Sequence, residues 1–98
     1  MTPEGRVKKD IKKILDAAGV WYYCPVSNGM GRHGIPDFIC CINGRFVAIE
    51  AKAANGKATT LQLGEFTKIK AAHGKAWLVF PDTIDVLRLM VDQVKYPR

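Results

Sequence analysis

The sequence lacks any long apolar run, and no stretch approaches the ~20 apolar residues that a membrane-spanning helix needs. Its first residues carry charges in place of an apolar leader segment, and it has no internal repeat or low-complexity stretch. A length of 98 residues leaves no room for a second core, and a 48% share of hydrophobic residues excludes a disordered chain. We therefore expect one soluble, cytoplasmic domain over residues 1–98, with no membrane partner.

Cysteine is scarce, and the three that occur, Cys24, Cys40 and Cys41, form no CxxC pair. Cys40 and Cys41 are neighbours in a predicted strand, so their side chains point to opposite faces of the sheet. A disulfide or a shared metal between them is therefore not expected. We predict three core thiols in a reducing compartment.

Acidic residues are also few, with nine Asp and Glu against fifteen Lys and Arg, and the net charge is +6. A basic surplus of this size favours a polyanionic partner such as nucleic acid. Many small basic domains have no such partner, so charge alone leaves a plain solvated surface open as an alternative.

The most informative stretch is a predicted β-hairpin whose turn is Asn43-Gly44. This dipeptide is the one that best tolerates positive φ at both central positions of a type I′ turn. With a two-residue turn, residues whose numbers sum to 87 face each other, so Asp37 opposes Glu50. Two carboxylates would then lie side by side in a strand pair that is apolar on both faces.

Like charges in directly opposed positions destabilise a sheet, and partial burial weakens the screening of their repulsion. A hard divalent cation such as Mg²⁺ or Mn²⁺ offsets this repulsion, because it prefers carboxylate oxygens. Lys52 projects from the same sheet face as Glu50, since side chains alternate along a strand. An ammonium group there can hold a metal-bound water or neutralise charge that develops on a phosphate. The pattern therefore predicts phosphodiester chemistry.

At these residues the chain resembles a known superfamily, because Pro36-Asp37 followed by Glu50-Ala51-Lys52 is similar to the pattern of the PD-(D/E)xK nucleases. The Gly34-Ile35 lead-in and the later Gln62 resemble one branch, the VRR-NUC (virus-type replication-repair nuclease) domain, in its stand-alone phage form. The resemblance covers nearly the whole chain. It implies an α/β fold with a restriction-endonuclease-like αβββαβ core, a mixed four-stranded sheet and a C-terminal helix.

The resemblance also implies metal-dependent cleavage of DNA, with branched or duplex DNA as the substrate. A homodimer would present two active sites, with the last helix and the strand around Trp77 as candidates for its interface. Holliday-junction resolution, restriction-type cleavage and a non-catalytic DNA-binding module of the same fold stay open as alternatives. The implied roles are Mg²⁺ or Mn²⁺ coordination by Asp37, Glu50 and the Ala51 carbonyl, water positioning or phosphate stabilisation by Lys52, assistance by Gln62, and a further ligand from Glu4.

Two of these residues have a structural interpretation beside the functional one. Glu4 lies in the first turn of a predicted helix, where an acid complements the helix dipole. Gln62 completes a Thr59-x-x-Gln62 capping box, in which its side chain reaches back to the N–H of the cap residue. Both alternatives stay open for each residue.

Hydrophobic periodicity and turn residues place the other elements. The stretch Gly29-x-Gly31-x-x-Gly34 matches a dinucleotide-binding motif in spelling only, because a proline and a strand follow it in place of a helix. We interpret residues 27–34 as a basic loop, and we expect Arg32, His33 and Lys57 to contact DNA phosphates. The aromatic residues Trp21, Tyr22, Tyr23 and Trp77 are predicted to lie in the core. The predicted elements are a helix capped by Thr2 and ended by Gly19, a strand over residues 20–24, a helix capped by Thr59 and ended by Gly74, a strand over residues 77–80, and a last helix capped by Asp82 or Thr83.

Overall fold

Four strands form one mixed sheet in the order β1-β2-β3-β4. The computed structural model describes residues 1–26 and 31–97. β2 pairs antiparallel with both β1 and β3, and β4 runs parallel to β3. This is the mixed four-stranded sheet that the sequence predicts. The strands are β1 (Trp21–Tyr23), β2 (Phe38–Ile42), β3 (Arg45–Ala51) and β4 (Lys75–Val79).

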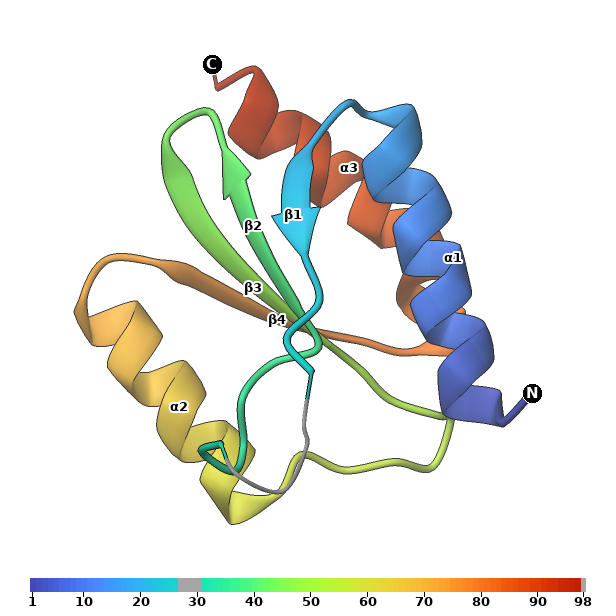
Figure 1. Cartoon of the computed structure of the whole chain (residues 1–98). Helices are drawn as coiled ribbons and strands as arrows, with labels where there is room; N and C mark the ends of the chain where they lie inside the picture. Colours follow the sequence, from blue (N-terminus) through green and yellow to red (C-terminus); the bar gives the residue numbers. More distant parts are fainter. Residues whose placement is uncertain (27–30, 98) are drawn as a thin grey trace.

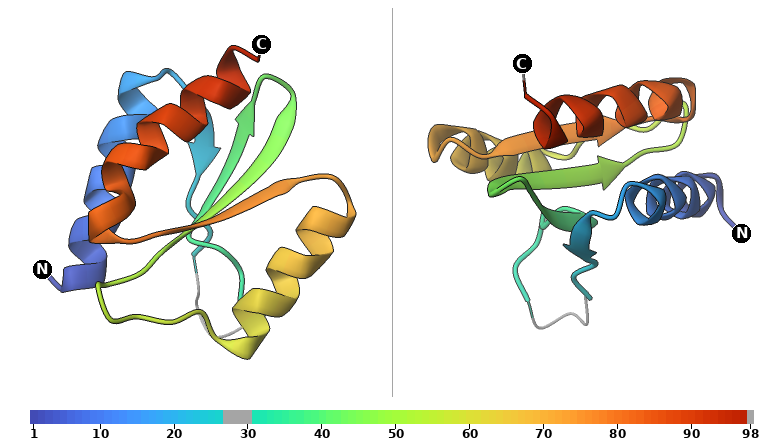
Figure 2. Two further views of the ribbon diagram at one scale, coloured as in Figure 1. Left: turned by 180° about the vertical axis from the view of Figure 1, so that it is seen from behind. Right: turned by 90° about the horizontal axis from the view of Figure 1, so that it is seen from above.

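The helices lie on two sides of the sheet, with α1 and α3 together on one side and α2 apart from them on the other (Figure 1). The view from behind shows α3 lying along α1 (Figure 2). The element order confirms the predicted α/β arrangement. The helices are α1 (Pro3–Ala17), α2 (Thr60–Ala71), the short 3₁₀ helix η1 (Pro81–Thr83) and α3 (Ile84–Lys95).

The first helix begins and ends where its sequence predicts. The Thr2 side chain accepts a hydrogen bond from the Gly5 N–H, and Pro3 occupies the first turn, where its missing N–H costs little. Gly19 follows the helix with φ of +66°, a conformation that glycine adopts without steric cost.

The hairpin has the predicted register. Asn43 and Gly44 both adopt positive φ, and Phe38 pairs with Ile49, so the partner numbers sum to 87. Asp37 lies immediately before β2, and its position across from Glu50 continues this register. The turn chemistry therefore fixes which residues of β2 and β3 can meet.

The two sheet faces differ in how they are covered. On the face toward α1 and α3, a large core joins alternate strand residues with the helices. On the face toward α2, a smaller cluster joins Ala48, Phe66 and Ala76. The core of the first face is Val7, Ile11, Ile14, Leu15, Phe38, Cys40, Ile42, Val47, Ile49, Ala51, Val79, Leu87, Val91 and Val94.

Several sequence predictions about burial are wrong. Trp21 and Tyr23 are exposed, because they lie on the edge strand and on the sheet face that is covered least. Cys41 is exposed for the same reason, whereas Cys40 on the opposite face is buried. Tyr22 also faces inward and packs against Phe38.

The start of the last helix also differs from the prediction. The Thr83 side chain does not cap α3; its hydroxyl accepts a hydrogen bond from the Phe80 N–H and closes η1. Among the described residues, no helix is long and apolar enough to cross a membrane.

Candidate active site

Asp37 and Glu50 meet on the α2 side of the sheet, each held by backbone of the neighbouring strand. The Asp37 N–H donates to Oε1 of Glu50 at 3.1 Å, and the Ala51 N–H donates to Oδ2 of Asp37 at 2.9 Å. These two reciprocal bonds result directly from the hairpin register. They fix both carboxylates before any ligand arrives, at the cost of bringing two like charges together.

Burial determines the protonation of Glu50, which is only 3% exposed. Desolvation and the negative charge of Asp37 raise the pKa of its carboxyl from 4.5 to about 7, although Lys52 acts in the opposite direction. Strongly raised carboxyl pKa values next to a second acid are typical of functional sites, because structural acids are normally exposed or fully paired.

Lys52 supplies a cation from the same sheet face. It is only 7% exposed, and its Nζ lies 3.4 Å from Oε2 of Glu50. Its backbone N–H donates to the Val79 carbonyl at 2.9 Å, which extends the pairing of β3 with β4 beyond Ala51. The ammonium group is therefore held beside the acids by the sheet itself.

Gln62 completes the predicted capping box and also contacts Glu50, while its assistance to catalysis stays a prediction. Its Oε1 accepts from the Thr59 N–H at 2.9 Å, and the Thr59 hydroxyl accepts from the Gln62 N–H at 3.1 Å, so the capping box is complete. Its Nε2 donates to Oε2 of Glu50 at 2.6 Å. The first turn of α2 is thereby tied to the buried acid.

Lys8 is a site residue that the sequence analysis missed. Its Nζ lies 3.4 Å from Oδ1 of Asp37 and 3.8 Å from Oε2 of Glu4. Burial lowers the pKa of Lys8, but Asp37, Glu4 and Glu50 together outweigh burial and the net shift is upward. The sequence feature that could have identified Lys8 is its position one helical turn after Glu4 and one residue after the buried Val7.

The predicted phosphate contacts lie on loops around this site. Arg32 forms an ion pair with Glu65 of α2, and His33 and Lys57 are exposed. Gly34 lies against the first turn of α2, where an added Cβ would come within 2.7 Å of the Leu61 carbonyl. The loop therefore packs against α2, the helix that carries Gln62. The part of the predicted loop at residues 27–30 lies outside the described residues.

The donor set of the site suits a hard divalent cation. Mg²⁺ commonly binds through one or two carboxylates and completes its coordination with waters. Asp37 and Glu50 offer two such groups, and Glu4 is separated from them by Lys8. Within the part of the chain that the structure describes, no three His, Cys, Asp or Glu residues gather as a ligand set. The residues therefore fit a cation held mainly by two carboxylates, and Glu4 as a further ligand stays a prediction.

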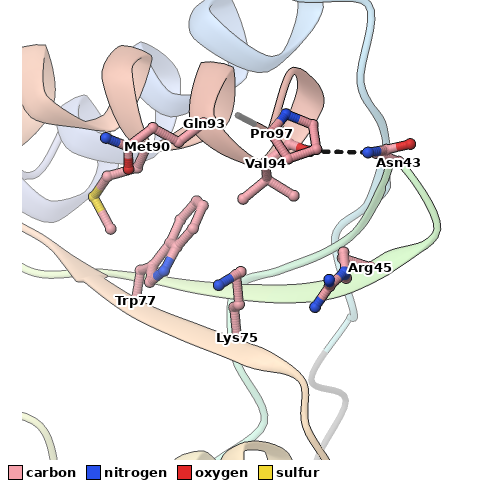
Figure 3. A pocket seen from close by; sticks show the side chains of 8 residues that line it. All are labelled: Asn43, Arg45, Lys75, Trp77, Met90, Gln93, Val94 and Pro97. Carbon is pink, nitrogen blue, oxygen red and sulfur yellow. Dashed lines mark hydrogen bonds between the residues drawn. The ribbon is translucent and has the colours of Figure 1, made fainter.

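A separate cavity of about 270 Å³ lies at the hairpin turn, between the sheet and α3 (Figure 3). Arg45, Lys75 and Trp77 line it from the strands, and the Asn43 amide donates to the Val94 carbonyl at its edge. The cavity contains neither Asp37 nor Glu50. It belongs to the opposite end of β3 from the acids.

Comparison with known proteins supports the fold. A solved structure named "VRR_NUC domain" matches 100% of this chain and 100% of its own chain, with a TM-score of 0.70 and 23% sequence identity. No family model and no curated protein matches the sequence. The similarity confirms the fold that the sequence resemblance predicted.

Proposed function

We propose that this chain is a metal-dependent nuclease of the VRR-NUC type that hydrolyses phosphodiester bonds of DNA. The observation that carries this proposal is the fixed pair of Asp37 and Glu50 with the buried ammonium of Lys52 beside it. A protein with only a structural use for this sheet has no reason to bury an acid whose pKa is raised to about 7. The name of the structural neighbour agrees with this activity.

Asp37, Glu50 and the Ala51 carbonyl would hold Mg²⁺ or Mn²⁺. When bound there, such a cation would supply water activation and neutralisation of phosphate charge, which an in-line phosphoryl displacement needs. Lys52 holds the attacking water or stabilises negative charge at phosphorus, because its ammonium is fixed next to Glu50. Gln62 keeps the Glu50 carboxylate oriented through its amide donor.

DNA is the substrate that the charge of the molecule favours. The net charge of +6 suits a polyanion, and the exposed His33 and Lys57 are available for phosphate contacts. The positive charge of Arg32 is partly neutralised by its ion pair with Glu65, so Arg32 is less available to a DNA phosphate than the sequence alone suggests. Few residues lie outside the core to read base edges, so DNA structure is a better target than base sequence.

The decisive experiment is cleavage of single-stranded, duplex, flapped and four-way-junction DNA by the purified protein, with EDTA, Mg²⁺ or Mn²⁺. We expect cleavage that requires metal and that Glu50→Ala loses, and the substrate ranking separates a junction resolvase from a general nuclease. Cleavage by Glu50→Ala at the wild-type rate would overturn the mechanism. DNA binding without any cleavage would identify a binding module.

We further propose that two copies associate through α3 to present two active sites. Two-fold symmetry matches antiparallel DNA strands. The exposed apolar residues Val86 and Leu89 on α3 and Tyr96 directly after it support this surface. Light scattering at micromolar concentration should give a dimer that Leu89→Lys converts to a monomer, and a monomeric wild type would contradict the proposal.

A further inference from the structure

The sheet face that carries the acids also carries three exposed aromatic side chains. Trp21 is 61% exposed, Tyr23 is 50% exposed and Phe46 is 45% exposed. Solvent-exposed aromatic residues in a row are unusual in a strand, because such side chains normally fill the core. We call Trp21, Tyr23 and Phe46 the aromatic platform.

The strand register places the Tyr23 end of the platform one row away from the acids. Trp21 pairs with Cys41, which pairs with Phe46, so these three side chains form one row across β1, β2 and β3. Tyr23 pairs with Ile39, which pairs with Ala48, and these residues form the next row. Continued by one more row, the same register reaches Asp37 and Glu50, which hydrogen bonds join. Successive rows on one face are about 7 Å apart. The aromatic platform therefore leads along the sheet to the site of chemistry.

Helix α2 leaves this part of the face open because it packs against β4 at the other edge of the sheet (Figure 1). Beside Phe46, the end of α2 forms a cavity of about 280 Å³ lined by Phe46, Lys68 and Ile69. Lys68 and Lys70 occupy the last turn of this helix. The far end of the platform is therefore basic.

We propose that the aromatic platform stacks unpaired bases of a single-stranded segment next to the bond that is cut, with Lys68 contacting its phosphates. This inference rests on the proposed nuclease function and names its substrate as DNA with unpaired nucleotides at the site. Bases of an intact duplex are stacked inside the helix and cannot reach the rings. Aromatic side chains along a basic surface are the usual means of holding single strands without sequence preference.

A nucleic-acid strand fits this surface better than a protein partner does. The rings lie on a path that ends at a phosphodiesterase-type site, and a cation stands at the opposite end. Trp21 and Tyr23 meet edge to face, with ring centroids 5.9 Å apart, so they do not cover each other by parallel stacking. Ring surface therefore stays available for bases.

The test compares two single-stranded oligonucleotides of equal length in EDTA, one normal and one with all sites abasic. Both carry the same phosphates, so any difference in affinity reports contacts to bases. We expect the wild type to bind the normal strand about tenfold or more tightly than the abasic strand. Trp21→Ala and Tyr23→Ala should bring the two affinities together, and Trp21→Phe should preserve most of the difference.

Leu63→Ala is the matched control, because Leu63 is as exposed as Tyr23 but lies on α2. It should leave the affinity difference unchanged. In the Trp77→Phe background, the fluorescence of Trp21 should be quenched by the normal strand and not by the abasic strand. This readout detects stacking directly, and comparing the two strands on the same protein removes any effect of stability.

Equal affinity of the wild type for the two strands, or no binding of either, would overturn the inference. Loss of self-association in Trp21→Ala, with the affinity difference retained, would identify the platform as a contact between copies and overturn it too. The assay contains EDTA, so it is independent of cleavage. If the protein cuts DNA but binds the normal and abasic strands equally, the proposed function stands and the platform inference fails. If it prefers the normal strand but does not cut DNA, the platform inference stands and the proposed function fails.

Discussion

Gln62 uses both ends of its amide group, one for helix capping and one for the acid site. Its carbonyl oxygen completes the capping box with Thr59, and its nitrogen donates to Glu50. The sequence suggested these as competing roles, because the capping pattern is local and visible, whereas contact with Glu50 depends on where α2 docks. One side chain fulfils both, so helix stability and acid orientation are coupled.

Substitution at Gln62 and at its capping partner separates the two roles. Thr59→Ala removes the cap hydroxyl and should lower the free energy of unfolding by about 1 kcal/mol, with cleavage retained. Gln62→Ala should cause a similar loss of stability and slow cleavage about tenfold, because Glu50 also loses a hydrogen-bond donor. Urea unfolding and single-turnover cleavage measure the two effects. Equal cleavage rates in both variants would contradict a role for Gln62 at the site.

Glu50 makes stability depend on pH in a direction opposite to that of a salt-bridged acid. Its carboxyl pKa is raised to about 7, so the folded protein binds the proton more tightly than the unfolded chain does. The free energy of unfolding therefore falls as pH rises from the unfolded pKa of 4.5 to about 7, and this contribution is level above that. The expected loss is on the order of 3 kcal/mol.

This effect can be isolated by urea unfolding in EDTA at about pH 5 and about pH 8. The wild type should lose more stability between these two values than Glu50→Ala does, because the variant lacks the titrating group. Comparing the two proteins cancels the titration of groups that they share. The same pH dependence in both would mean that Glu50 titrates normally in the folded protein.

At the scale of elements, the site depends on the contact between Gly34, in the loop that leads to Asp37, and the start of α2. Gly34 has φ of +82°, and a Cβ there would lie 2.7 Å from the carbonyl carbon and oxygen of Leu61. Both the backbone conformation and the close approach require glycine. The contact joins the loop before β2 to the turn that carries Gln62, so the two halves of the site are positioned together.

Gly34→Ala tests this contact, with Gly44→Ala as the control. Gly44 also has positive φ, at +76°, but an added Cβ there meets no atom within 4 Å. Gly44→Ala should therefore cost about 1 kcal/mol of unfolding free energy, which is the backbone penalty alone. Gly34→Ala should cost clearly more and weaken cleavage. Equal losses in thermal unfolding would show that the Leu61 contact is easily relieved.

The hairpin was predictable in detail, whereas the packing of α2 was not. Asn43-Gly44 selects a two-residue turn, and the turn fixes every β2 and β3 pairing. Exposure of Trp21 depends instead on α2 leaning toward β4, which no local pattern of residues determines. The same dependence on docking concealed the role of Lys8, whose contact with Asp37 requires α1 to lie across the end of the sheet.

At the scale of the whole molecule, the two acids lie at one end of the sheet. Two acids and two lysines there come from α1, the residues flanking β2 and β3, and the sheet itself. The sequence predicted the acids and Lys52 because strand alternation and register are regular. We propose that these charges, rather than the fold alone, perform hydrolysis.

Asp37→Asn tests that claim most directly, because asparagine keeps the size of the side chain and an oxygen that can accept from the Ala51 N–H, yet removes the charge. The measurement is the single-turnover rate of DNA cleavage in Mn²⁺, with thermal unfolding as the control for folding. We expect a folded protein that cleaves at least about a hundredfold more slowly than the wild type. A folded Asp37→Asn protein that cleaves at the wild-type rate would contradict it.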